Sequence, residues 1–212
     1  FLEFNFGYTG SENFAINNQF GFFPAFSLAW NISEEPIVKN KLNWLEMFKL
    51  RYSWGRVGND NVGTRFPYMY AIGENMGSYQ WADFDFTRSF QGKSYTQVAS
   101  NGITWEIATK DDLGVDLSLF NDKLTATVDY FSEKRTGIYM RRQYLPEIVG
   151  LGSQPRANVG VVTSKGFDGH FALKQKAGTV DVTLRGNITY SKNEVQERDE
   201  ETKVYPYEYD SG

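Results

Sequence analysis

Paired carboxylates are the residues of this chain whose spacing could support catalysis, because two Asp or Glu side chains flanking a glycosidic bond suffice to hydrolyse it. The candidate pairs are Asp83/Asp85, Asp111/Asp112 and Glu34/Glu35. Adjacent residues of a strand point to opposite faces, so neighbouring acids on a strand cannot act on one bond together. No pair stands in a distinguishing context, and we do not expect an enzyme.

The composition excludes several other classes of site. The 212 residues include no Cys and a single His, so thiolate chemistry and Cys/His zinc sites are ruled out, and a Ser-His-Asp triad would rest on His170 alone. Asp60, Asp83 and Asp85 lack the spacing of a calcium-binding loop, and we expect neither a metal nor a cofactor. A net charge of −4 with scattered basic residues argues against a nucleic-acid partner.

An alternation of period two runs through most of the chain and predicts β-strands. It is clearest between Phe22 and Ile32, where the even positions are mostly large and apolar and the odd positions small or polar. We expect seven strands, near residues 2–8, 22–32, 48–54, 103–120, 124–130, 158–175 and 182–190. No apolar run reaches the roughly 18 residues of a membrane-spanning helix, but a spanning strand needs only about 10 alternating residues.

The expected connections alternate in length. Short or modest turns follow Ile32, Phe120 and Gln175, whereas longer loops follow Tyr8, Gly58, Arg141 and Tyr190. The first of the shorter connections, up to Trp44, has room for one helical turn. Short turns at one end and long loops at the other are typical of outer-membrane barrels.

The two faces of the strands differ in chemistry. The apolar face carries Leu, Val and aromatic residues, including Ile103, Trp105 and Ile107, with rings at Trp30, Phe48 and Phe120 near one margin, as expected for an aromatic girdle. The opposite face carries both signs of charge, and in a barrel it would face the lumen. Its candidate lumen-facing residues are Lys49, Arg51, Glu106, Lys110, Asp112, Asp116, Asp129 and Arg185.

A soluble, aromatic-rich β-sandwich that binds carbohydrate would show a similar alternation, and this alternative stays open here. On the 103–120 strand, Thr109 and Asp111 end the apolar row near Leu113, through polarity or through a bulge.

The segment from Gly58 to Gly102 is far longer than an ordinary connection, and such length usually accompanies function or disorder. Disordered segments are poor in aromatic residues, so we expect this one to be partly folded and to face a ligand or partner. Self-packing of the rings into a lid is the alternative. The candidate binding residues are Tyr68, Tyr70, Tyr79, Trp81, Phe84 and Phe86, whose rings could stack on sugars or peptide side chains.

Blocks along the chain resemble, in order and spacing, the barrel of SusC/RagA-like TonB-dependent outer-membrane transporters. They are YTGSENF (8–14), GFFPAFSLAWNISEE (21–35), FKLRYSWGRVGN (48–59), TWE (104–106), LGVDLSLFNDKLTATVDYF (113–131) and NVGVVTSKGFD (158–168). The blocks fall on nearly every expected strand, so the resemblance covers most of the chain.

The resemblance implies an all-β fold: about seven strands of an antiparallel, up-and-down transmembrane barrel of 22 strands in the outer membrane of a Gram-negative bacterium. Residues 1–212 would then be an internal part of that barrel domain, with the plug domain and the closing strands outside this chain. It further implies import of oligosaccharides or peptides, a SusD-like surface lipoprotein over the mouth, outer-membrane lipid around the wall, and energy from the TonB system through the plug.

Overall fold

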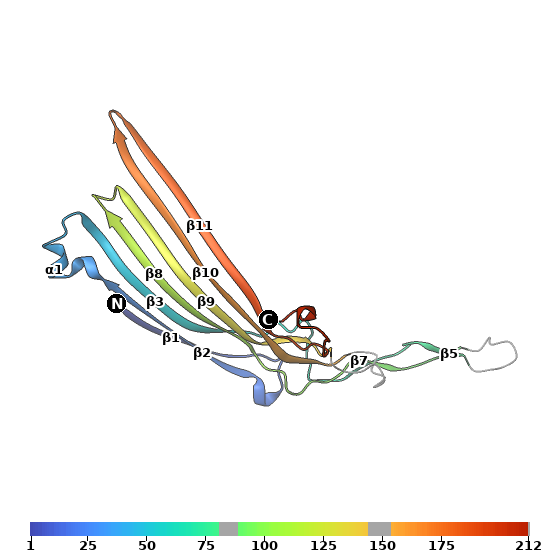
Figure 1. Cartoon of the computed structure of the whole chain (residues 1–212). Helices are drawn as coiled ribbons and strands as arrows, with labels where there is room; N and C mark the ends of the chain where they lie inside the picture. Colours follow the sequence, from blue (N-terminus) through green and yellow to red (C-terminus); the bar gives the residue numbers. More distant parts are fainter. Residues whose placement is uncertain (81–88, 144–153, 212) are drawn as a thin grey trace.

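The computed structural model describes residues 1–80, 89–143 and 154–211. Seven long strands form one antiparallel sheet in which every strand pairs with its neighbours in chain order. These strands are β1 (Leu2–Gly10), β2 (Phe20–Asn31), β3 (Leu45–Asn59), β8 (Glu106–Leu119), β9 (Leu124–Arg141), β10 (Arg156–Ala177) and β11 (Val180–Glu197). The up-and-down order confirms the expected antiparallel meander, and the edges of β1 and β11 do not meet within this chain, so the barrel is not closed (Figure 1).

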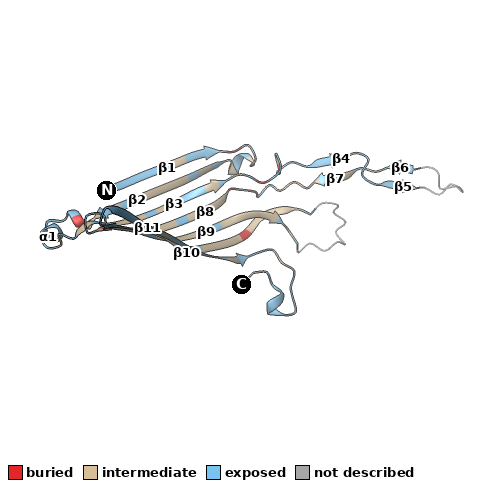
Figure 2. Cartoon of the chain, turned by 90° about the horizontal axis from the view of Figure 1, so that it is seen from above, coloured by how far each residue is buried: buried red, intermediate tan, exposed pale blue. Residues whose placement is uncertain are grey.

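The sheet is a single layer. No second sheet covers either face among the described residues, and most side chains of the long strands are half-buried or exposed (Figure 2). Large apolar side chains of the apolar face are open to the surroundings, among them Phe4 and Ile188 at 65% and 63% exposure. A sandwich must bury such a face against its second sheet, so the β-sandwich alternative is wrong.

The hydrogen-bond register aligns the apolar residues into rows across the strands. One row runs from Leu2 on β1 through the six residues paired in turn with it, and it ends at Tyr190 on β11. Its complete membership is Leu2, Leu28, Tyr52, Leu113, Tyr130, Phe167 and Tyr190. We call this row the upper apolar row, because on β8 to β11 the next outward row toward the long loops contains Asp111, Ser132, Lys165 and Lys192. On β1 to β3 the apolar face continues outward in that row through Phe4, Phe26 and Trp54.

The apolar band also shifts along the strands from β2 to β11. On β2 its last residue toward the short turns is Trp30, which pairs with Leu50, whereas β3 continues to Phe48. On β11 the band extends to Val180. Such a stagger is what tilted strands require if the band is to stay level around a barrel.

The two ends of the sheet are connected differently, as expected. At one end lie the β8–β9 turn, the β10–β11 turn and the β2–β3 connection, which contains η2 (Ile32–Glu34) and α1 (Pro36–Lys39) and so confirms the expected helical turn. The β8–β9 hairpin turns through Asn121 and Asp122, both at a φ of 57°. No helix among the described residues is long and apolar enough to span a membrane.

The other end carries the long segments. The β3–β8 segment is partly folded, as expected: β4 (Ala71–Gly73) pairs with β7 (Ser94–Gln97), and β5 (Ser78–Gln80) pairs with β6 (Ser89–Gln91). We call residues 66–97 of this segment, within the described residues, the loop arm, and it extends away from the sheet (Figure 1). Two 3-10 turns, η1 (Ile16–Asn18) and η4 (Pro206–Glu208), also lie outside the strands.

The small hydrophobic core lies at this long-loop end. It consists of Phe14, Val62, Ile103 and Trp105, with Phe23 packed edge-on against Trp105 at 5.1 Å between ring centroids. The Trp105 indole N–H donates to the carbonyl of Gln19. The placement of Ile103 and Trp105 on the apolar face is therefore wrong: β8 begins only at Glu106, and these two side chains are buried under the connecting segments instead.

Within β8 the apolar row ends at Leu113, as expected. Pairing with β3 and with β9 runs without a register shift from Thr109 to Leu113, so the bulge alternative is wrong. Polarity alone ends the row, and Asp111 accepts a hydrogen bond from the Tyr52 hydroxyl at 3.0 Å.

Candidate functional site

The charged face is organised around Arg51. Its Nε and one Nη donate to the two carboxylate oxygens of Asp116 at 2.8 and 3.1 Å, and the same Nη lies 2.8 Å from Asp129. Thr127 also donates to Asp116. The three charged residues come from β3, β8 and β9, so a single guanidinium links three consecutive strands. Bidentate Arg–carboxylate geometry is the strongest form of this contact.

Gly114 makes this link possible. It lies between Arg51 and Asp129 in the register, opposite the first on β3 and the second on β9. A Cβ at this position would lie 2.2 Å from Asp129 Oδ1 and 2.8 Å from Arg51 Cζ. Only a residue without a side chain leaves room for the guanidinium to cross β8 here.

A second ionic group lies on the same face nearer the long loops. Lys110 and Arg135 both contact Glu133, and Arg135 also faces Glu106 at 3.8 Å. Glu133 and Arg135 lie beyond the apolar band of β9, which ends at Tyr130. Burial alone would raise the pKa of Glu133, but the hydrogen bond from Arg135 and the charge of Lys110 outweigh it and hold that pKa below its ordinary value.

Glu133, Arg135 and Gly114 were not among the residues predicted from the sequence. The first two lie on the charged side of the β9 alternation beyond Asp129, so extending the alternation to residue 135 would have found them. Gly114 gave no signal, because its role depends on which residues flank it on the neighbouring strands.

The register places all eight candidate lumen-facing residues on this one face, but only some of them make contact. Arg51, Asp116 and Asp129 form one group, and Glu106 and Lys110 join the other. Lys49, Asp112 and Arg185 take part in no ion pair within the described ranges. Whether the face lines a lumen remains a prediction.

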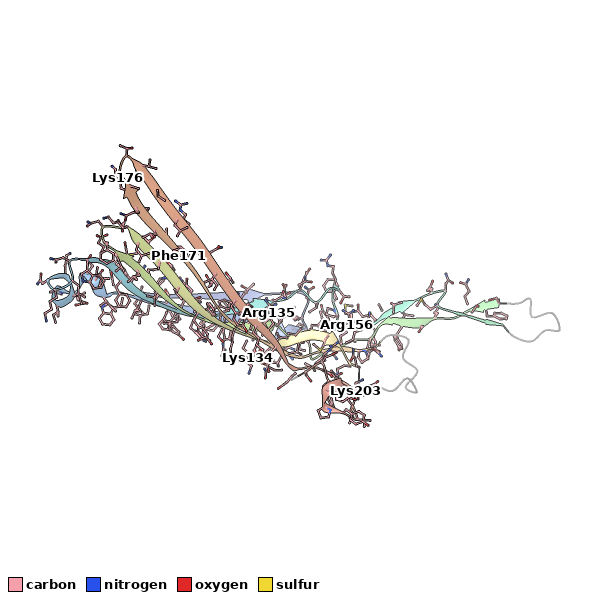
Figure 3. All side chains as sticks on the ribbon, turned by 45° about the horizontal axis from the view of Figure 1, so that its top comes forward. Lys134, Arg135, Arg156, Phe171, Lys176 and Lys203 are labelled. Carbon is pink, nitrogen blue, oxygen red and sulfur yellow. The ribbon has the colours of Figure 1, made fainter. Side chains whose placement is uncertain are left out.

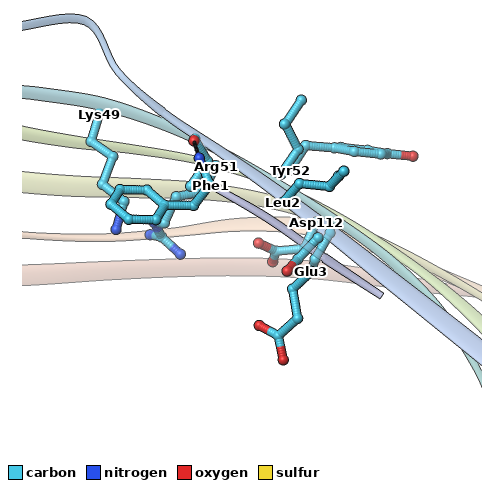
Figure 4. Close-up of a pocket in the computed structure, with 11 residues that line it drawn as sticks. Phe1, Leu2, Glu3, Lys49, Arg51, Tyr52 and Asp112 are labelled. Carbon is cyan, nitrogen blue, oxygen red and sulfur yellow. Dashed lines mark hydrogen bonds between the residues drawn. The ribbon is translucent and has the colours of Figure 1, made fainter. Parts of the chain in front are cut away.

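A hollow of about 540 Å³ lies at the β1 edge of the sheet. Glu3, Lys49 and Asp112 line it from the charged face and Tyr52 from the other (Figure 4). Because both faces contribute, this hollow follows the open edge of the sheet and is not a binding site enclosed by one face.

The loop arm carries only part of the predicted aromatic set within the described residues. Tyr68 is half-buried and packs edge-on against Phe66, whereas Tyr70 is exposed and lies 5.5 Å from Tyr95. The backbone of Tyr79 pairs with that of Phe90. The remaining predicted residues, Trp81, Phe84 and Phe86, lie outside the described residues, as do Asp83 and Asp85.

The other carboxylate pairs do not converge on a reaction site. Asp111 and Asp112 point to opposite faces, and Glu34 pairs with Lys39 while Glu35 accepts from the Trp30 indole. In the described part of the chain, no group of three or more His, Asp or Glu side chains is placed to hold a metal. What the charged face offers chemically is a set of fixed, mutually oriented charges.

A one-layered antiparallel sheet with an uncovered apolar face, an ionic face, short turns at one end and long segments at the other defines the wall of an outer-membrane-type β-barrel. Residues 3–210 match the family model described as "TonB dependent receptor-like, beta-barrel". The chain belongs to this family.

Individual relatives agree with this assignment. TonB-dependent receptor P3 of Formosa agariphila is 30% identical over 190 residues, covering 87% of this chain and 17% of the relative. TonB-dependent receptor SusC of Bacteroides thetaiotaomicron is 29% identical over 200 residues, covering 92% and 19%. The chain thus spans about a fifth of these relatives.

Solved structures show the same fold. The RagAB peptide importer in its closed-closed state superposes with a TM-score of 0.76 at 19% identity, covering 97% of this chain and 22% of that chain. The open-open state gives a TM-score of 0.73.

Proposed function

We propose that this chain is a section of the wall of a TonB-dependent transporter in the outer membrane of a Gram-negative bacterium. The observation that carries the proposal is the apolar face, which no part of the described chain covers and which lipid would cover in a barrel. The opposite, ionic face would then line the water-filled interior and contact the plug, with Arg51 fixing the positions of Asp116 and Asp129. The proposed role is transport and not catalysis.

The proposed substrates are oligosaccharides or peptides, and the proposed partners are a SusD-like surface lipoprotein and the TonB system. The resemblance to SusC/RagA-like transporters supports this choice, and the exposed rings of the loop arm supply surfaces on which sugars or peptide side chains stack. Tyr70 and Tyr95 are the described pair best placed for this contact, because both are exposed and their rings already lie together.

The transport proposal is tested by deleting the gene that encodes this chain. Growth is then compared on oligosaccharides and on peptides as carbon sources, and repeated in a strain lacking TonB. Both deletions should abolish growth on the same class of substrate and spare growth on its monomers. Unchanged growth on every oligosaccharide and peptide would contradict the proposal.

The role of the loop arm is tested by replacing Tyr70 and Tyr95 together with Ala in the full-length protein. Affinity for the substrate or for the co-purifying lipoprotein should fall by about tenfold, since each stacked aromatic contact contributes about 0.5–1.5 kcal/mol and two are removed. The matched control replaces Tyr205 and Tyr207, a stacked and exposed pair outside the arm, which should change neither affinity. If the two variants bind with equal affinity, the rings of the loop arm serve only to pack against one another.

A further inference from the structure

Two lysines face each other directly on the apolar side of the sheet. Lys165 on β10 and Lys192 on β11 are directly paired in the register, and both are exposed. The ion pairs of the described residues include neither. Like charges directly opposite each other destabilise a strand pair, so this arrangement favours an anion between the two ammonium groups.

The position of the two lysines along the strands is also specific. Each lies one outward step beyond the stacked rings of Phe167 and Tyr190, whose centroids are 5.7 Å apart. These rings are the last apolar residues of this face before the lysines on β10 and β11, so on these two strands the lysines mark the height at which the apolar surface ends. That is the height of lipid head groups in a barrel whose apolar band lies in the bilayer.

Neighbouring charges extend the cationic surface. Lys134 on β9 is exposed, lies one outward step beyond Ser132, and is on the opposite face from its neighbour Arg135 (Figure 3). Two acids lie near the lysines on this side. Asp111, in the same register row as Lys165, accepts a hydrogen bond from the Tyr52 hydroxyl, and Glu194 lies one row farther out, after Lys192 on β11. Three lysines therefore lie near a single carboxylate, that of Glu194, which accepts no hydrogen bond from the described residues.

We propose that Lys165 and Lys192, supported by Lys134, bind the phosphate groups of a phosphorylated lipid in the leaflet nearest the long loops. This inference rests on the proposed placement of the apolar face in the outer membrane, where that leaflet is the external one. The aromatic rings below the lysines contact the upper acyl chains and the ammonium groups contact the phosphates, so one lipid engages both rows.

The experiment uses the full-length transporter in phosphatidylcholine nanodiscs containing increasing fractions of diphosphorylated lipid A. Native mass spectrometry measures how much lipid A stays bound after release from the nanodiscs. Replacing both lysines with Gln (K165Q/K192Q) should weaken lipid A binding by about 30-fold, from the usual contribution of a cation near an anionic surface. The charge-keeping variant K165R/K192R should bind lipid A like the natural protein.

The matched control is K123Q/K176Q, which removes two lysines from the opposite, short-turn end of the sheet. Figure 3 labels Lys176 at that end. It should retain natural binding. Natural affinity in K165Q/K192Q would overturn the proposal, as would equal losses in that variant and the control. Displacement of lipid A by millimolar inorganic phosphate would identify a site for free anions and overturn the assignment to lipid.

If K165Q/K192Q fails to fold, the lipid-binding proposal is tested on the natural protein alone. The natural protein should bind lipid A stripped of both phosphates about 30-fold more weakly than the diphosphorylated form, and equal binding of the two would overturn the proposal without any variant. The transport proposal fails separately, through unchanged growth of the deletion strain or through failure of the protein to enter nanodiscs.

Discussion

The guanidinium of Arg51 reaches across an entire strand to Asp129, with its Nη2 2.8 Å from the Asp129 Oδ1 and the backbone of Gly114 between them. Both side chains remain partly solvated, at 33% and 18% exposure, so the contact is neither a free surface pair nor a fully buried one. It ties β3 to β9 through side chains where the backbone ladder ties each only to β8.

Replacing Gly114 with Ala should break this contact, because the new Cβ would lie within 2.2 Å of the Asp129 carboxylate. We expect the free energy of unfolding of the full-length protein to fall by about 1 kcal/mol, a value reduced from that of a buried charged hydrogen bond because of the partial exposure. Denaturant unfolding measures it. Gly7→Ala is the control, since its nearest neighbour would lie 4.0 Å away. Equal losses of unfolding free energy in the two variants would show that Gly114 matters only through its backbone, and not through the room it leaves for Arg51.

An arginine on the apolar face should be costly where one on the charged face is tolerated. Ile188 and Asn187 are consecutive residues of β11 that point to opposite faces. Ile188→Arg should destabilise the inserted protein by about 2–4 kcal/mol, whereas Asn187→Arg should have little effect. The yield of folded protein in the outer-membrane fraction reports the difference. The reverse order would mean that the faces are assigned the wrong way round.

Acidification should weaken the ionic group around Glu133. The pKa of Glu133 is lower in the folded protein than its ordinary value of 4.5, so the unfolded chain binds a proton more readily than the folded one. The stabilisation from this carboxylate is therefore complete above about pH 5 and is lost as the pH falls through the lower, folded pKa. Unfolding free energies of the natural protein and of Glu133→Gln should differ at neutral pH and converge in acid. Parallel curves would refute this.

The small core around Trp105 should stabilise the connecting segments and not the sheet. Trp105 is 7% exposed, and replacing it with Ala should cost about 3–5 kcal/mol locally, as for other buried aromatic residues. Hydrogen–deuterium exchange should speed up around Phe14 and Val62 and stay unchanged in β10 and β11. Trp54→Ala, on the apolar face, is the control and should leave exchange near Phe14 as it is.

The strands were predictable because the alternation of apolar and polar residues is a local property. It located all seven long strands and the short turns, and the aromatic content of the 58–102 segment predicted its partial folding. It failed at Ile103 and Trp105, because these residues continue the alternation by sequence while their side chains pack on Phe14 and Phe23. Burial of a side chain by residues that are distant in the sequence does not alter the local alternation, so the alternation cannot reveal it.

The ion pairs of the charged face were not predictable from the sequence. Arg51 and Asp129 are 78 positions apart, and their contact depends on the register of two strand pairs and on the missing side chain at Gly114. Periodicity assigns a residue to a face, but only the register decides which residues on that face become neighbours.

The one-layered sheet leaves the strands with almost no interior of their own. Backbone hydrogen bonds between neighbouring strands hold the sheet together. Their apolar face is shielded from water only if the surrounding medium is itself apolar. The thermodynamic stability of this wall is thus a joint property of protein and surroundings. Thinner or more fluid bilayers should loosen it without any change in its amino acids.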